Sequence, residues 1–102
     1  MHIDYVRSGG FAGIRLAGSF DTEKLPSEQA ATLGKLIDGA GFFRLPEQIK
    51  SSSQVPDQFE YRVTISPAEK THSVVVDESV IPDSLRPLLD FLTKLVISSK
   101  KQ

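Results

Sequence analysis

Alternation of apolar and polar residues is the feature that most constrains the fold of this chain. From Phe59 to Ser66 every second side chain is apolar, and the run from His72 to Asp77 continues the pattern after the turn-type segment 67–70. Such a period of two is typical of a β-strand with one buried and one solvated face. The two runs therefore predict an antiparallel hairpin.

A second hairpin is predicted at the start of the chain. The runs 2–7 and 14–20 alternate in the same way, and six residues join them: Ser8, Gly9, Gly10, Phe11, Ala12 and Gly13. Glycine permits turn torsions and close backbone approach that other residues forbid. An aromatic side chain at such a tip, Phe11, favours insertion into a partner. A simple turn with Phe11 packed back on the sheet remains the alternative.

Two amphipathic helices are predicted, one after each hairpin. In residues 26–39 and 83–98 apolar side chains recur at helical spacing. Gly39 or Gly41 can end the first helix in the left-handed conformation. Gly34 lies inside that helix at a cost of about 1 kcal/mol relative to alanine, and we expect a close contact with the sheet to explain it.

The order ββαββα predicts an α+β fold in a single domain, 1–102. The simplest arrangement is a four-stranded antiparallel sheet from two hairpins, with both helices on one face. We expect residues 42–46 to be a short extended segment that places aromatic side chains at the edge of the core. Residues 47–56, with three consecutive serines, predict a mobile loop.

The composition excludes several classes of protein. The net charge of −1 gives no electrostatic footprint for nucleic acid or an anionic membrane, and without cysteine neither a disulfide nor a cysteine-based zinc site can form. No apolar run approaches the roughly 20 residues of a membrane helix. We therefore expect a cytoplasmic monomer without cofactor or bound metal.

No constellation for catalysis is visible. His2 is next to the terminus, and His72 shares the parity of an apolar strand face, where a histidine is typically a satisfied edge residue. The adjacent pair Asp77 and Glu78 is interpreted as the end of a strand. Without a nucleophile, base and oxyanion donors in a recognisable pattern, the sequence favours a binding protein over an enzyme.

Four stretches, in order and at these spacings, resemble the emfourin family. They are Ser8-Gly9-Gly10-Phe11-Ala12-Gly13, then Ala40-Gly41-Phe42-Phe43-Arg44-Leu45-Pro46, then the alternating run from Asp57 to Ile65, and finally Pro82-Asp83-Ser84-Leu85-Arg86-Pro87-Leu88-Leu89. The resemblance implies a tight, reversible inhibitor of protealysin, a thermolysin-like zinc metallopeptidase. It further implies that the inhibitor is made in the cytoplasm beside a peptidase that also lacks an ordinary export signal. Whether it protects the cytoplasm from that enzyme or is released with it stays open.

Under that resemblance, the glycine-rich tip with Phe11 is the first candidate for contact with the peptidase. If the second hairpin lies antiparallel beside the first, we expect its turn, with Pro67, Glu69 and Lys70, at the same end of the sheet as a second prong. The loop 50–57 is a further candidate. Zinc ligation by the terminal amine or by His2 also remains open. The alternative function is a non-inhibitory interaction module that regulates another enzyme.

Overall fold

The computed structural model describes residues 1–9, 15–51, 58–66 and 71–100. Within these ranges the chain forms two α-helices, three short 3-10 helices and five strands. Their order is β1 (His2–Gly9), β2 (Leu16–Asp21), η1 (Thr22–Lys24), α1 (Ser27–Ala40), η2 (Phe42–Arg44), β3 (Gln48–Ile49), β4 (Phe59–Ser66), β5 (His72–Asp77), η3 (Glu78–Val80) and α2 (Arg86–Lys100).

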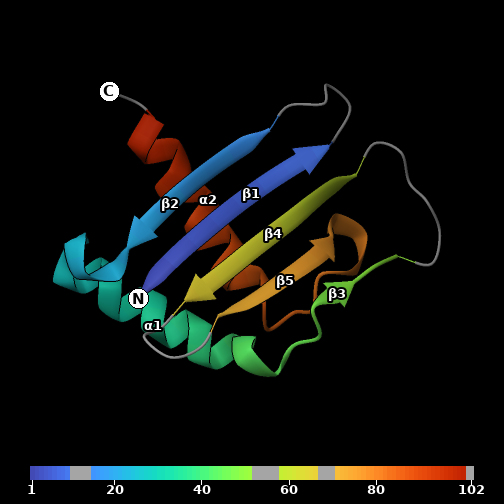
Figure 1. Ribbon diagram of the computed structural model, residues 1–102, viewed down its shortest axis with the longest axis horizontal. Helices are drawn as coiled ribbons and strands as arrows, with labels where there is room; N and C mark the ends of the chain where they lie inside the picture. Colours follow the sequence, from blue (N-terminus) through green and yellow to red (C-terminus); the bar gives the residue numbers. More distant parts are fainter. Residues whose placement is uncertain (10–14, 52–57, 67–70, 101–102) are drawn as a thin grey trace.

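The strands lie in the order β2-β1-β4-β5-β3, and both helices cover the same face of the sheet (Figure 1). β1, β2, β4 and β5 pair antiparallel, as predicted, whereas β3 pairs in parallel with β5. The α+β class is confirmed, but the expectation of a four-stranded, wholly antiparallel sheet is wrong. The additional strand, β3, falls in the segment predicted as a loop. Next to it, Val75 N of β5 donates to Glu47 O at 2.8 Å.

The alternation of the strands determines where the core lies. In each of β1, β4 and β5, two residues at alternate positions point toward the helices and are buried, as the pattern predicts. The apolar stripes of α1 and α2 complete one buried cluster with them. It comprises Ile3, Tyr5, Leu33, Ile37, Ala40, Phe42, Val63, Ile65, Val74, Val76, Leu85, Leu88, Leu89, Leu92 and Val96.

Helix α1 ends as predicted. Gly41 has φ +61° and its N–H donates to the carbonyls of Asp38 and Ile37, so it is the left-handed cap. The expected close contact at Gly34 is wrong, because a Cβ added there would meet no atom within 4 Å. Residues 42–44 are a short 3-10 helix and not extended, since the reversal at Gly41 allows Arg44 N to donate to Gly41 O.

Helix α2 begins later than predicted. Leu85 N and Arg86 N both donate to Pro82 O, so a turn precedes the helix, which starts at Arg86. Pro87 still lies in the first turn, where its missing N–H leaves no intrahelical bond unmade. None of the described helices is long and apolar enough to cross a membrane.

Candidate partner-binding site at one end of the sheet

The strand register separates two ends of the sheet. β4 runs opposite to β1, so Gly9 pairs with Phe59 at one end and His2 pairs with Ser66 at the other. We call the first the loop end, because the described neighbours of segments 10–14 and 52–57 meet there. It lies at the upper right of Figure 1. It comprises Ser8, Gly9, Arg15, Leu16, Lys50, Ser51, Gln58, Phe59 and residues 77–80, which are the end of β5 and the η3 turn after it.

Two of the predicted contact residues, Ser8 and Gly9, lie at the loop end. Ser8 pairs with Glu60, and Gly9 is exposed with φ +91°. A Cβ on Gly9 would stand 2.9 Å from Gln58 O, so only glycine fits. The close approach allowed by this glycine is thus to the chain's own β4. Gly10, Phe11, Ala12 and Gly13 lie outside the described residues.

The expected second prong is not beside the first. Ser66 and Thr71, which flank Pro67, Glu69 and Lys70, lie at the end of the sheet where β1 begins. A strand that runs antiparallel to β1 must end where β1 starts, so the expectation that both hairpin turns share an end is wrong. Pro67, Glu69 and Lys70 themselves lie outside the described residues.

Arg7 contacts the loop end from the helix-facing side of the sheet. It has the parity of the buried Ile3 and Tyr5, and its guanidinium carbon lies 4.4 Å from the ring centroid of Phe59. A cation over an aromatic face is attracted by the ring quadrupole. Its Nε is buried and has no hydrogen-bond partner in the described part of the chain. Sequence alternation indicates its position but not this contact.

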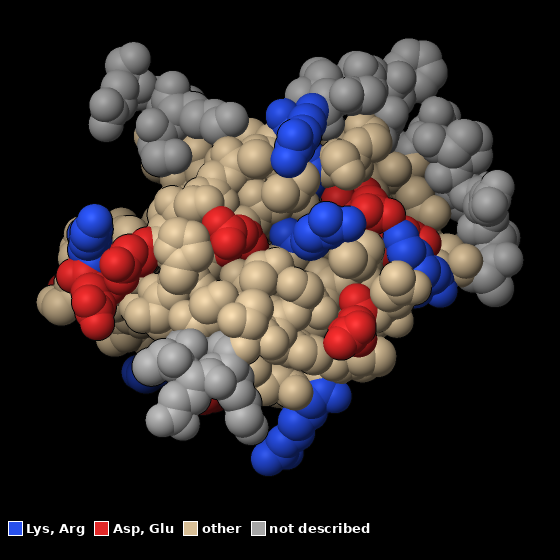
Figure 2. Space-filling view, in the orientation of Figure 1, with Lys and Arg blue, Asp and Glu red and all other residues tan. Residues whose placement is uncertain are grey.

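On the opposite face of the loop end, an ion cluster joins β4 and β5 to Lys50, the residue that follows β3. Lys50 Nζ contacts the carboxylate of Glu60 and lies 3.5 Å from Asp77 Oδ1. The hydrogen bond to Glu60 raises the pKa of Lys50 above its ordinary value. Acidic and basic side chains are interspersed over this face (Figure 2). Glu60 and the exposed Arg62, which alternate with the buried residues of β4, both lie on this face.

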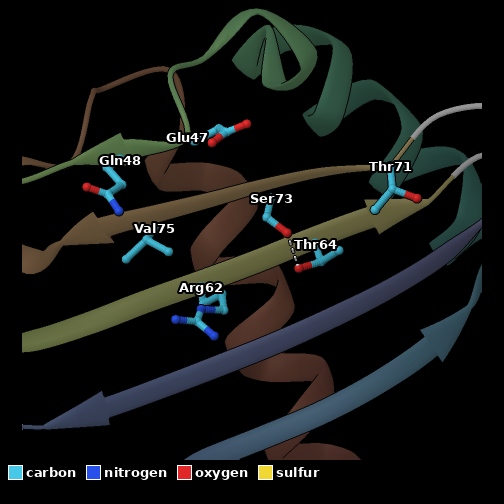
Figure 3. Close-up of a pocket in the computed structure, with 7 residues that line it drawn as sticks. All are labelled: Glu47, Gln48, Arg62, Thr64, Thr71, Ser73 and Val75. Atoms are coloured by element: carbon cyan, nitrogen blue, oxygen red, sulfur yellow. Dashed lines mark hydrogen bonds between the residues drawn. The ribbon is translucent and has the colours of Figure 1, made fainter.

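A shallow depression on the open face offers the polar groups shown in Figure 3. Its volume is about 450 Å³, and Gln48, Arg62, Thr64 and Ser73 are among the residues that line it. The Ser73 and Thr64 hydroxyls form a hydrogen bond to each other at 2.7 Å. The lining within the described residues includes no histidine. The lining does include one carboxylate, that of Glu47.

His72 is a structural residue. One ring nitrogen lies 2.8 Å from Leu45 O, and the ring packs edge-on against Phe42 with centroids 5.5 Å apart. This confirms the prediction of a satisfied edge histidine. His2 lies 3.2 Å from Asp4, at the end of the sheet opposite the loop end. Among the described residues, no group of three or more His, Asp or Glu side chains could hold a metal ion.

The fold defines a small two-layer α+β protein. Its best candidate site is the loop end, where two connecting segments meet the sheet. The described residues contain no catalytic constellation. A comparison with protein families matches the emfourin model over residues 5–93. The chain therefore belongs to the emfourin family, whose members are protein inhibitors, and this membership indicates a protease-inhibitor role. Neither the curated proteins nor the solved structures gave a match.

Proposed function

We propose that the chain inhibits a thermolysin-like zinc metallopeptidase by placing the loop end in the active-site cleft. The observation that carries the proposal is the register of β1 and β4. Gly9 pairs with Phe59, so segment 10–14 begins and segment 52–57 ends at the same end of the sheet, the loop end. Loops held by such a scaffold are the usual place for binding residues.

Phe11 is the proposed anchor of this contact. Thermolysin-like enzymes, as the family resemblance implies, favour a large apolar residue on the primed side of the cleft, and Phe11 can fill that pocket. The hairpin that carries it has stiff flanks, because Gly9 packs against Gln58 O and Arg7 lies over Phe59. Pre-organised flanks reduce the entropy lost on binding and resist the extended pose that cleavage requires.

The inhibitor acts by binding and not by catalysis, as a monomer, in the cytoplasm beside its peptidase. Zinc ligation by the terminal amine or by His2 does not fit a contact through the loop end, because His2 pairs with Ser66 and Asp21 at the opposite end. For the same reason we exclude Pro67, Glu69 and Lys70 from the proposed contact. Substitutions there become the natural controls.

The test is inhibition of a purified thermolysin-like peptidase by the wild-type chain and by Phe11→Ala, Gly10→Glu and Lys70→Ala. Full burial of a phenylalanine stabilises by roughly 2 kcal/mol, so Phe11→Ala should raise the inhibition constant about thirtyfold. Gly10→Glu should weaken inhibition further, and Lys70→Ala should leave it unchanged. Near-wild-type inhibition by folded Phe11→Ala and Gly10→Glu would remove the tip from the mechanism. No inhibition by the wild type would favour the non-inhibitory interaction module.

A further inference from the structure

We infer that Asp77, Glu78 and Ser79 are positioning residues that hold both flanks of segment 52–57 against the sheet and so preset the loop end for the peptidase. This inference rests on the proposed function and deepens it. The three residues lie where β5 passes into η3. The sequence pattern predicts only that Asp77 and Glu78 end a strand. Neither residue belongs to the buried core cluster.

The flank before the segment is held by Asp77. Ser51 N donates to Asp77 Oδ2 at 2.8 Å, and the other carboxylate oxygen lies 3.5 Å from Lys50 Nζ. Lys50 in turn contacts Glu60. Asp77 is partly shielded, with 14% of its side chain exposed, so its bond to Ser51 competes with little water. The chain therefore leaves β3 along a fixed path.

The flank after the segment is held by Glu78 and Ser79. Phe59 N donates to Glu78 Oε1 at 2.9 Å, and Ser79 donates to Gln58 Oε1 through its backbone N at 3.1 Å and its hydroxyl at 2.7 Å. Phe59 N belongs to the first residue of β4, opposite Gly9. The same three consecutive residues thus fix the chain at both ends of the segment.

The two anchored flanks are coupled to the first hairpin. Gln58 O is the atom that a Cβ at Gly9 would meet, and the Phe59 ring lies under the Arg7 guanidinium. Releasing Glu78 from Phe59 N should therefore loosen the edge against which Gly9 packs. A carboxylate that accepts from a backbone N–H makes a bond roughly twice as strong as a neutral pair. Loss of such bonds should show as weaker inhibition by a chain that is still folded.

The experiment compares Asp77→Ala and Glu78→Ala with Asp77→Asn and Glu78→Gln. The amide variants lose the charge but keep an oxygen that can accept from the backbone N–H. A matched control is Asp21→Ala, because Asp21 Oδ1 accepts from Glu23 N at 3.0 Å at the opposite end of the sheet. Asp21→Ala removes a bond of the same kind at the end of the sheet where we expect no contact with the peptidase.

Two readouts are needed. In the free protein, amide hydrogen exchange at Ser51 should become about tenfold faster in Asp77→Ala, and exchange at Phe59 about tenfold faster in Glu78→Ala. With a thermolysin-like peptidase, both alanine variants should raise the inhibition constant about tenfold. The two amide variants should stay within about threefold of wild type, and Asp21→Ala should match it.

The inhibition constant separates positioning from plain structural support. A modest loss of global stability leaves the folded fraction near one, so it does not change the inhibition constant. Faster exchange with unchanged inhibition by both alanine variants would overturn the inference, while Phe11→Ala still reports on the proposed function. Equal weakening by the alanine and amide variants would also overturn it, because charge and not the backbone bonds would then be responsible. A wild-type chain that inhibits no such peptidase would instead overturn the proposed function.

Discussion

Gly18, at the centre of β2, allows α2 to lie close against the sheet. A Cβ added to Gly18 would stand 2.8 Å from Val96 Cγ2 and 3.3 Å from Val96 Cγ1. Val96 is fully buried, and its β-branched side chain is stiff at χ1, so it cannot rotate away cheaply. Overpacking of this kind costs about 1–3 kcal/mol, against a gain of about 0.5–1 kcal/mol from replacing a strand glycine. Gly18→Ala should therefore lower the free energy of unfolding by about 1–2 kcal/mol.

The test of that reasoning is a double-mutant cycle with Val96→Ala. Val96→Ala alone should cost about 2 kcal/mol, from the transfer of two methyl groups and the space they leave. In that background the obstacle at Gly18 is gone, so Gly18→Ala should become neutral or stabilising. Urea unfolding followed by far-UV circular dichroism measures all four proteins, since the chain has no tryptophan. Equal destabilisation by Gly18→Ala in both backgrounds would refute the contact with Val96 as its cause.

Two further predictions concern stability. Gly34→Ala should raise the free energy of unfolding by about 0.5–1 kcal/mol, because the new Cβ meets open space inside α1; a lower urea midpoint would contradict this. Burial raises the pKa of Tyr5, whose hydroxyl lies 2.6 Å from Thr93 Oγ1, so the folded state favours the neutral phenol. The stability that this shift contributes to the folded state is complete below the ordinary tyrosine pKa of about 10. It is lost as the pH rises through the higher pKa that Tyr5 has in the folded protein. The stability difference between wild type and Tyr5→Phe should therefore shrink above about pH 10; a constant difference from pH 8 to 11 would contradict it.

Much of the fold could be predicted from the sequence because four strands and both helices carry strong periodic signals. β3 could not, since a pair of residues at a sheet edge has no period to detect and is defined by its bonding to β5. Propensity also missed the 3-10 helix at 42–44, which depends on the left-handed Gly41 before it.

The candidate site was predicted only in part. The glycine-rich turn is visible in the sequence, and the need for glycine at position 9 is confirmed by its φ and by Gln58 O. The placement of the second turn was wrong because it depends on strand direction, which local pattern does not fix. Asp77, Glu78 and Arg7 contact residues 19 to 52 positions away in the chain, and no local signal reports such contacts.

We expect the loop end of the sheet, and not the end with the chain terminus, to meet the peptidase. The most direct measurement is the change in backbone NMR shifts of the ¹⁵N-labelled chain on titration with a thermolysin-like peptidase. We predict the largest changes at Gly9, Arg15, Ser51 and Gln58, with little change at the other end. Large changes confined to His2, Ser66 and Thr71 would contradict the account.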